Sequence, residues 1–590
     1  AVNALTLSPA LCALLLKPYT NEDGSSKNNF AAKFRKAFNA AFGTISEKYK
    51  KIVLVFVKHR WLTWGLLICS VAALVYLMET TKTSLVPQED QGTIMVNVST
   101  APGNSLQTTN EIMGQIEQRL LTIPQVQNLQ VVSGYGLISG QGSSFGMAIV
   151  KLKPWDEREK KEDAVDAVIG QIYARTADIK DAQVFAMSPG MIPGYGMGNS
   201  LDIQMQDKAG GDINTFYGTV QQFLGALNQR PEIAMAYSTF DVRYPQWMVD
   251  VDAAKCKRAG TTPNAVLSTL AGYYGGQYVS NFNRFSRVYR VMMQADPKHR
   301  MDEKSLDNTF VRLANGEMAP LSQFVTLTRV YGAETLSRFN MYNSIAVSAM
   351  PAEGYSTGDA IRAVEETAAA ALPIGYGYDF GGITREESQQ SGQTGIIFAI
   401  CFLMVYLILC ALYESFVVPF AVLLSVPCGL MGTFLFAKIM GLENNIYLQT
   451  GLIMLIGLIA KTAILLTEYA TERRHAGMSL IASAVSAAKA RLRPILMTAL
   501  TMIFGMLPLM AATGVGANGN RSLGSGVVGG MVIGTLAMLF VVPSLFIAFQ
   551  WLQEKIKPLQ TEPTEDWQIQ EEMEETEKEL KEAGIDTSKK

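Results

Sequence analysis

The sequence has few of the residues on which enzyme active sites and metal sites depend. Its 590 residues contain three histidines, His59, His299 and His475, and these are scattered along the chain. No Ser/His/Asp set, closely spaced His/Cys cluster or phosphate-binding loop is apparent, which argues against an enzyme with a membrane anchor. Charge is balanced, with 50 Lys and Arg against 52 Asp and Glu, and no basic stripe indicates a nucleic-acid partner. We therefore expect no catalytic residues, no bound cofactor and no metal.

Cysteine does not supply a scaffold either. Five of the six cysteines (12, 69, 401, 410 and 428) lie in apolar runs, which leaves Cys256 alone in the large polar region. A single water-facing thiol cannot close an intrachain disulfide. The sequence therefore predicts no disulfide framework.

Long apolar runs are abundant. About 20 apolar residues suffice to cross the roughly 30 Å hydrocarbon core of a membrane. Complete spans are predicted at 61–78 and, within a block of five over 394–549, at 394–413, 418–438, 446–470, 494–513 and 524–549. Residues 1–18 have no charged start typical of a secretory signal and resemble the end of a truncated transmembrane helix. We therefore expect the chain to be part of a larger protein.

The distribution of positive charge predicts the orientation in the membrane. Residues 19–60 are rich in Lys and Arg, as is the connector at 470–493, which places both in the cytoplasm. Phenylalanines recur every four residues from Phe30 to Phe42, a pattern typical of an amphipathic helix on the inner leaflet, or alternatively of a packed soluble helix. The charged tail at 550–590 is expected in the cytoplasm as a solvated helix or a disordered segment.

The roughly 300 residues between the first and second complete spans alternate between strand-like and helix-like periods. A βαββαβ series is predicted over 79–190, and a second series is predicted in two parts, 191–245 and 336–388. The segment RFNMYNSIAVSAMP at 338–351 is predicted as one strand of the second series. Residues 246–335 form an insertion. The predicted fold is an α-helical integral membrane bundle plus an α+β region of ferredoxin-like subdomains with an inserted domain.

Lys461 is the most unusual residue of the predicted spans. It lies about 15 residues, or roughly 22 Å of helix rise, into its span, and no span contains Asp. A charge inside hydrocarbon costs about 3 to 10 kcal/mol unless it is paired or hydrated. The side chain could instead extend to the membrane surface, or pair with Glu468 roughly 10 Å away. We favour a proton relay in which Lys461 faces carboxylates supplied by a part of the protein outside this chain.

Several long motifs resemble one family. GLIAKTAILLTEYA, ARLRPILMTALTMIFGMLPL, ALYESFVVPFAVLLSVP, SLVPQEDQGTIMVNVSTAPGNS, LKPWDER and GYGLISGQG are similar to the C-terminal half of the resistance-nodulation-division (RND) efflux permeases, in the hydrophobe/amphiphile branch. The resemblance implies a homotrimeric proton/drug antiporter of the bacterial inner membrane. It also implies a periplasmic adaptor and an outer-membrane channel as partners, and protons as the coupling ion. The regions at 79–190 and 191–388 then lie in the periplasm, as two porter subdomains with a docking domain at 246–335.

The resemblance also assigns residues. By position, Lys461, Arg491 and Thr498 match the proton relay, while Thr462 replaces the usual Asn and is expected to tune the coupling. The aspartate pair of the family belongs to a helix that this chain lacks. The N-terminal half of the permease is therefore expected to supply it, and the chain alone is not expected to transport.

The substrate pocket is assigned in the same way. Gly134, Gly136, Gly140 and Gly142 match a switch loop, although a plain surface turn would have the same composition. The predicted pocket residues are Tyr135, Leu137, Ile149, Phe185 and Met187. Only Phe185 keeps the phenylalanine common at these positions, so the pocket is expected to be less aromatic and more polar than usual. Without the resemblance, such residues would more often belong to a core.

Two other functions remain open at this point. Met187, Met191 and Met197 could bind soft Cu(I) or Ag(I), which suggests a heavy-metal exporter. A proton-driven accessory of protein or lipid export would share the helices without needing a drug cleft. Within the last span, Gly526, Gly530 and Gly534 recur every four residues, which predicts that another helix approaches closely there.

Overall fold

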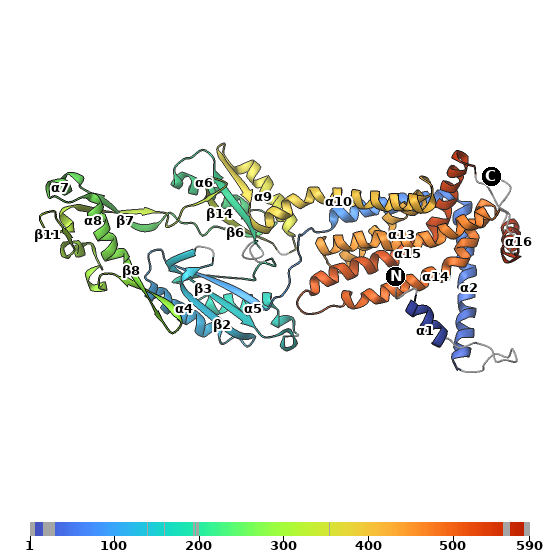
Figure 1. Ribbon diagram of the computed structural model, residues 1–590, viewed down its shortest axis with the longest axis horizontal. Helices are drawn as coiled ribbons and strands as arrows, with labels where there is room; N and C mark the ends of the chain where they lie inside the picture. The colour runs from blue at the N-terminus through green and yellow to red at the C-terminus, as the bar shows by residue number, and fades with distance from the viewer. Residues whose placement is uncertain are drawn as a thin grey trace.

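The computed structural model describes residues 6–15, 30–137, 140–158, 160–192, 195, 200–352, 354–558 and 567–582. These parts form an elongated molecule in three sections (Figure 1). A bundle of long helices lies at one end, two α/β units lie next to it, and a smaller unit lies at the opposite end. This arrangement confirms the predicted combination of a helical membrane bundle with a mixed α/β region.

Among the described residues, six helical segments are long and apolar enough to cross a membrane. They are α3 (Arg60–Thr80), the part of α10 (Gly382–Tyr413) from Gly395 onward, α11 with α12 (Pro419–Leu423 and Val426–Ile439), α13 (Ile446–His475), α14 (Leu480–Met510) and α15 (Ala517–Ile556). The run predicted at 418–438 is divided into two helices. Pro419 and Pro427 each lie in the first turn of a helix, where the N–H that proline lacks is not needed.

The basic connector predicted at 470–493 is helical over most of its length. α13 continues to His475 and α14 begins at Leu480, after a turn in which Gly477 has φ +99°. Ser479 caps α14 by accepting a hydrogen bond from the backbone N–H of Ala482. Both helices therefore extend past their apolar runs at the end of the bundle that faces away from the α/β units, which we term the distal end.

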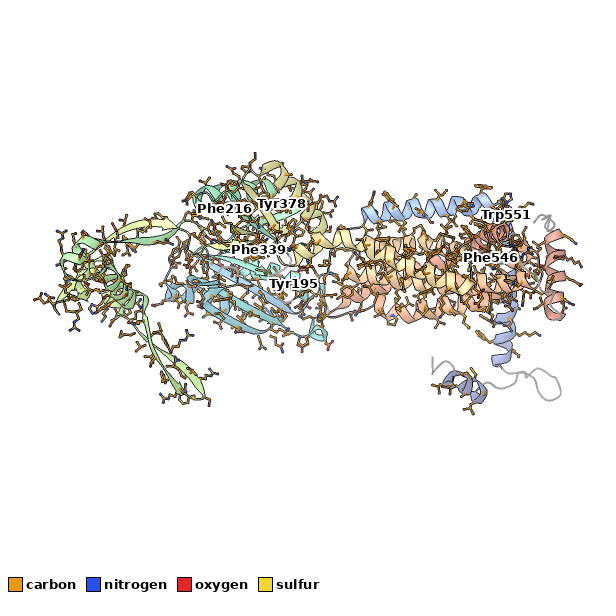
Figure 2. All side chains as sticks on the ribbon, turned by 45° about the horizontal axis from the view of Figure 1, so that its top comes forward. Tyr195, Phe216, Phe339, Tyr378, Phe546 and Trp551 are labelled. Atoms are coloured by element: carbon orange, nitrogen blue, oxygen red, sulfur yellow. The ribbon has the colours of Figure 1, made fainter. Side chains whose placement is uncertain are left out.

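Glycines allow the helices of the bundle to pack closely. A Cβ atom at Gly432 of α12 would lie 2.7 Å from the carbonyl oxygen of Gly529 in α15. A Cβ atom at Gly530 would clash with Cδ2 of Leu455 in α13. The close approach predicted from the glycine repeat of the last span is therefore present, and α15 packs against both neighbours. Phe546 of the same helix is fully buried in the bundle (Figure 2).

The first α/β unit contains a four-stranded sheet with two helices on one face. Its elements are β1 (Thr93–Thr100), α4 (Leu106–Leu120), β2 (Val126–Gly136), β3 (Gly140–Leu152), α5 (Val165–Thr176) and β4 (Ala182–Met187). The strand order is β2-β3-β1-β4, and all neighbours are antiparallel. The alternation along β1 explains the packing, because Ile94, Val96 and Val98 are fully buried in the same core as residues of α4 and α5.

The second α/β unit repeats this order with one additional strand, β13. Its elements are β5 (Leu201–Asp207), α6 (Ile213–Leu227), β6 (Ile233–Tyr237), β13 (Ser337–Phe339), β14 (Tyr342–Pro351), α9 (Thr357–Ala371) and β15 (Tyr376–Phe380). β14 lies between β5 on one side and β13 and β6 on the other, and β15 lies beyond β5. Phe216 of α6 is fully buried in its core (Figure 2).

The prediction of a single strand over 338–351 in this unit is wrong. The segment 338–351 is a hairpin of β13 and β14, because the turn residues Asn340 and Met341 have φ of 51° and 72°. Positive φ at both central residues is the geometry of a tight two-residue hairpin turn.

The insertion is attached through a two-stranded ribbon of β7 (Tyr244–Val251) and β12 (Val325–Gly332). The ribbon leads to α7 (Ala253–Arg258), α8 (Pro263–Leu270), β10 (Phe310–Arg312) and β11 (Met318–Pro320), which share a small core around Cys256. A long hairpin of β8 (Gln277–Arg284) and β9 (Arg287–Met293) extends from this unit, and every residue of both strands is exposed. Figure 1 shows this unit at the end far from the bundle.

Three further helices lie near the bundle. α1 (Ser8–Leu15) is exposed, and α2 (Phe30–Lys58) crosses the distal end (Figure 1). α16 (Trp567–Glu582) belongs to the tail that was expected to be solvated or disordered. That expectation is wrong for α16, because Leu580 is only 1% exposed and Met573 packs against the main core of the bundle.

Candidate functional site

Three of the predicted pocket residues lie on the uncovered face of the first sheet. Met95 of β1 is directly opposite Ile149 of β3 and Met187 of β4, and Asn97 is opposite Met147 and Phe185. Since side chains alternate along a strand, these six residues share the face that α4 and α5 do not cover. Ile149 and Phe185 are partly exposed there, whereas Met187 is buried.

The glycine-rich loop joins β2 to β3 at the edge of this face. Gly134 and Gly140 have φ of +86° and +76°, a region that favours glycine. The side-chain oxygen of Asn97 accepts a 2.8 Å hydrogen bond from the backbone N–H of Leu137, which ties the loop to the uncovered face. Tyr135 is 41% exposed on the loop, and residues 138–139 lie outside the described part.

A second contact restricts the loop on its β3 side. A Cβ atom at Gly142 would lie 2.7 Å from the ring of Phe145 and 2.9 Å from Oε1 of Glu334, which precedes β13. The loop therefore packs against the connection between the insertion and the second unit. Partial burial raises the pKa of Glu334.

Two residues of this region were missed by the sequence analysis. Tyr237 of β6 contacts Phe185 across the two α/β units, with ring centroids 4.8 Å apart, and its burial raises its pKa to about 12. Asn97 anchors the glycine loop. The motif SLVPQEDQGTIMVNVSTAPGNS contains Asn97 but gives it no role, and Tyr237 lies in none of the motifs. The pairing register, which brings Asn97 opposite Phe185, reveals the relation of Asn97 to the predicted residues.

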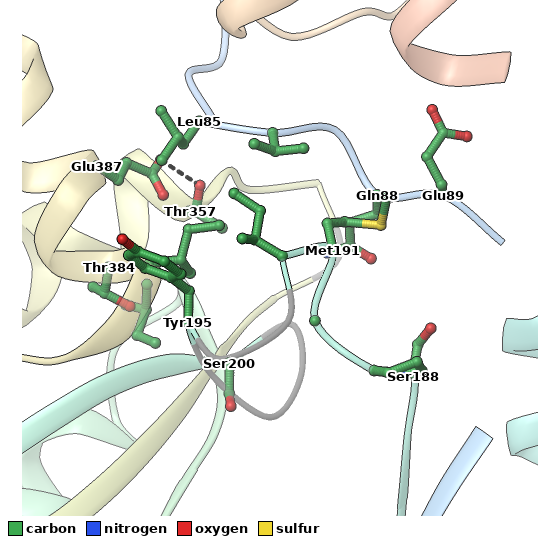
Figure 3. A pocket seen from close by; sticks show the side chains of 16 residues that line it. Leu85, Gln88, Glu89, Ser188, Met191, Tyr195, Ser200, Thr357, Thr384 and Glu387 are labelled. Carbon is green, nitrogen blue, oxygen red and sulfur yellow. Dashed lines mark hydrogen bonds between the residues drawn. The ribbon is translucent and has the colours of Figure 1, made fainter. Parts of the chain in front are cut away.

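A cavity of about 60 Å³ lies where the α/β units meet α10. Figure 3 shows Glu387 of α10 in its wall, where its carboxylate accepts a 2.6 Å hydrogen bond from the hydroxyl of Thr357. Burial, together with a smaller effect of Glu443, raises the pKa of Glu387 to about 7 against the opposing effect of that hydrogen bond. Small-molecule sites usually occupy about 300 Å³ or more. We therefore interpret this cavity as a junction between sections and not as a substrate pocket.

The two described methionines of the predicted metal site have different surroundings. Met187 is buried at the end of β4, the sulfur of Met191 accepts a hydrogen bond from Gln91 at 3.3 Å, and Met197 lies outside the described residues. Within the described part of the chain, no group of three or more His, Cys, Asp or Glu residues could hold a metal ion.

Lys461 lies on an uncovered face of α13. Thr450, Ile453, Gly457, Lys461 and Glu468 recur at helical spacing, and all five are exposed. The opposite face is buried in the bundle. The structure gives Lys461 no ion pair among the described residues, and Glu468 is about two turns further along the helix. The side chain therefore has an open position in the middle of a potential membrane span.

The other two predicted relay residues lie on α14. The guanidinium of Arg491 lies 4.7 Å from the ring centroid of Tyr469 on α13, and its Nε is buried with no hydrogen-bond acceptor among the described residues. The hydroxyl of Thr498 donates to the carbonyl of Pro494, and that of Thr462 donates to the carbonyl of Leu458. The structure thus connects Arg491 to α13 through Tyr469 and leaves Lys461 without an ion-pair partner in the described part of the chain.

These features define a protein with several helices long and apolar enough to cross a membrane, a large α/β region between the first two of them, and an exposed lysine midway along α13. Comparison with known proteins identifies the family. Residues 1–550 match the model of the AcrB/AcrD/AcrF family, and the chain belongs to that family.

Three curated relatives illustrate the similarity. The chain is 35% identical over 551 residues to the multidrug/solvent efflux pump membrane transporter MepB of Pseudomonas putida, covering 92% of this chain and 52% of MepB. It is 35% identical to the multidrug export protein AcrF of Escherichia coli K12, covering 93% and 53% of the two chains. It is 34% identical to the multidrug resistance protein MdtF of E. coli O6:H1, covering 94% and 53%. The chain thus spans about half the length of these relatives, which are named as transport and resistance proteins and not as enzymes.

Proposed function

We propose that this chain is the C-terminal half of a proton-driven RND permease that exports drugs and other amphiphilic compounds. The similarity to multidrug efflux proteins over about half their length supports this proposal. In this proposal, 79–190 and the pair 191–245 and 336–388 are ferredoxin-like porter subdomains, and 246–335 is a docking domain. The repeated βαββαβ order of the two units is consistent with it.

The uncovered face around Lys461 carries the proposal. A lysine in hydrocarbon is too costly to remain unpaired, so an acidic helix from the other half of the permease would pack on this face. A Cβ atom at Gly457, one turn before Lys461, would have no neighbouring atom within 4 Å, which leaves room for a close helix contact. Ionised carboxylates on that helix would attract Lys461, and protonation would release it. The change in attraction would move the helices. This movement would drive conformational changes in the α/β region, which lies outside the membrane.

The uncovered face of the first sheet would contact substrate. Ile149 and Phe185 offer apolar surface, the exposed Tyr135 offers a hydroxyl group, and the glycine loop, tied to the buried Asn97, lies at the edge. Tyr135 and Leu137 on this loop would contact compounds that pass it. A mixed apolar and polar surface of this kind suits amphiphilic molecules better than strongly charged ones.

The proposed assembly follows from the family resemblance. It is a homotrimer in the bacterial inner membrane, with the α/β region in the periplasm, α2 and α16 in the cytoplasm, and the insertion directed toward an outer-membrane channel and a periplasmic adaptor.

The proposal is tested by producing this chain together with its N-terminal half in cells that lack their own efflux pumps. We expect lower accumulation of amphiphilic dyes, reversal by a protonophore, and no effect of either half alone. Unchanged accumulation across a broad dye panel would contradict drug efflux. Tolerance to copper or silver without dye efflux would instead support metal export.

A further inference from the structure

The C-terminal helix α16 lies beyond the residues that match the family, which end at 550. It nevertheless packs on the distal end of the bundle, against α2, α13 and α14. Leu580 and Thr576 are buried, and Met573 contacts the main core. An isolated helix of 16 residues is only marginally stable in water, so these contacts stabilise α16.

Acidic residues of α16 pair with cations on all three helices. The pairs are Glu572 with Arg473 of α13 at 3.1 Å, Glu575 with Lys489 of α14 at 3.6 Å, and Glu579 with Lys50 of α2. The side chains of Lys50 and Arg473 are only 7% and 12% exposed. Removing an anion from so buried a cation is costly, so the pairs at Glu572 and Glu579 fix the position of α16.

Glu572 also contacts Tyr469, the residue whose ring lies against Arg491. Its carboxylate accepts hydrogen bonds from the hydroxyl of Tyr469 at 3.3 Å and from the hydroxyl of Ser486. The Tyr469 oxygen in turn accepts a 2.6 Å hydrogen bond from Arg473. These bonds fix the orientation of the tyrosine side chain.

The ring of Tyr469 is the surface on which Arg491 rests. The guanidinium carbons of Arg473 and Arg491 lie 4.3 Å and 4.7 Å from its centroid. A carboxylate that accepts a hydrogen bond from the phenol hydroxyl makes the ring more electron-rich and so strengthens its attraction for cations. Nε of Arg491 has no acceptor in the described part of the chain, and the guanidinium lies over the ring of Tyr469, which is a contact between Arg491 and α13.

We propose that Glu572 is a positioning residue that acts through Tyr469 on Arg491, and that α16 holds it in place. The role in transport rests on the proposed function, whereas the docking of α16 does not. In this arrangement α16, which lies beyond the residues that match the family, sets the orientation of Arg491 from the distal end.

Docking is tested by amide hydrogen exchange of residues 567–582 in the complete transporter in lipid nanodiscs. We expect exchange at least about tenfold slower than in an unfolded peptide, and loss of that protection in the Leu580→Glu variant. Exchange at the unfolded-peptide rate in the wild type would overturn the docking and with it the inference. This measurement requires no transport activity.

Positioning is tested by dye efflux from cells that produce the complete transporter, measured over a range of pH. We expect Glu572→Gln to lower the rate about tenfold near neutral pH. We also expect the pH midpoint to move toward lower pH, since removal of a negative charge lets neighbouring acids release protons more readily. Glu572→Asp should restore much of the rate. Glu574→Gln serves as the matched control, because Glu574 is an exposed carboxylate of the same helix.

The outcomes separate the two proposals. A wild type that transports no dye contradicts the proposed function, and the hydrogen exchange still decides the docking. A Glu572→Gln variant with wild-type rates and midpoint overturns the positioning role. If the dye-transport rate of Glu572→Gln falls equally at every pH and α16 loses its protection from exchange, the role of Glu572 is purely structural. This result also overturns the positioning role.

Discussion

The sheet of the first α/β unit and helix α13 of the bundle each have one closed face and one open face, but the two open faces differ. The closed face of the sheet buries Ile94, Val96 and Val98, and its open face presents Ile149 and Phe185. α13 buries residues such as Leu455 and Ile459 and leaves Lys461 exposed. In both regions, predicted functional residues such as Phe185 and Lys461 lie on the open side.

The difference lies in the solvent on the open side. The sheet satisfies its backbone hydrogen bonds internally, and its open face can remain in contact with water. In the proposed membrane orientation, the open face of α13 would lie at the depth of the hydrocarbon core, where a lysine costs several kcal/mol unless it is paired. In that orientation the sheet could remain open as a binding surface, whereas the bundle would require a further helix. The following predictions test this distinction, beginning with the largest effect.

Replacement of Lys461 by Ala tests the open face of the bundle. In the complete transporter we expect dye efflux to fall to background, because the proposed carboxylates lose the cation that responds to their protonation. Efflux is measured as dye accumulation in cells at equal protein levels. Lys438→Ala is the control, since Lys438 lies near the end of α12 and donates to the hydroxyl of Thr80. Wild-type efflux by the Lys461→Ala variant would reject the relay.

Gly432→Ala tests the closed side of the bundle. The added methyl group would meet the carbonyl oxygen of Gly529 at 2.7 Å, a backbone atom that cannot move independently. We expect a loss of about 1 to 3 kcal/mol in the free energy of unfolding, the usual cost of overpacking. The measurement is the thermal unfolding midpoint of the purified complete transporter. Gly65→Ala is the matched control, because a Cβ atom at the exposed Gly65 of α3 has no neighbour within 4 Å. Equal midpoints for both variants would contradict close packing of α12 on α15.

Local patterns in the sequence predicted most of the elements of the α/β region. The alternation in TIMVNVST and the helical spacing that follows correspond to β1 and α4, since each pattern buries one face. The hairpin turn at Asn340 and Met341 was not predicted, because a positive φ at two residues other than glycine depends on the surrounding sheet. A pattern of local residues cannot contain that information.

The contacts of α16 were missed for a related reason. Its many glutamates are typical of a solvated helix, and their partners Lys50, Arg473 and Lys489 lie about 90 to 530 residues away in the sequence. Tyr237 was also missed, because its contact with Phe185 joins two separately folded units. Lys461 was identifiable because a charge in an apolar run is a local signal, and its proposed acidic partner remains a prediction.

Phe185→Ala tests the open face of the sheet. Removal of the ring deletes apolar surface and the aromatic contact with Tyr237, so we expect substrate affinity to fall about three- to tenfold. Tyr237→Phe keeps the ring contact and serves as the control. The measurement is the substrate concentration at half-maximal transport for several dyes. An effect on the transport rate but not on this concentration would place Phe185 outside the binding surface.

Glu387→Gln tests the junction between α10 of the bundle and the α/β units, and is expected to have the smallest effect. Burial raises the pKa of Glu387 from 4.5 to about 7, so the folded junction favours the neutral carboxyl group. Its contribution to stability is present below about pH 4.5 and is lost as the pH rises through about 7. The wild type should therefore unfold at a lower temperature at about pH 8 than at about pH 5, and Glu387→Gln should reduce this difference. The exposed neighbour Glu386, replaced by Gln, is the control. If Glu387→Gln keeps the full pH dependence of the wild-type unfolding temperature, the carboxyl group of Glu387 is not the source of that dependence. α10 and the α/β units would then meet without a titrating contact at this residue.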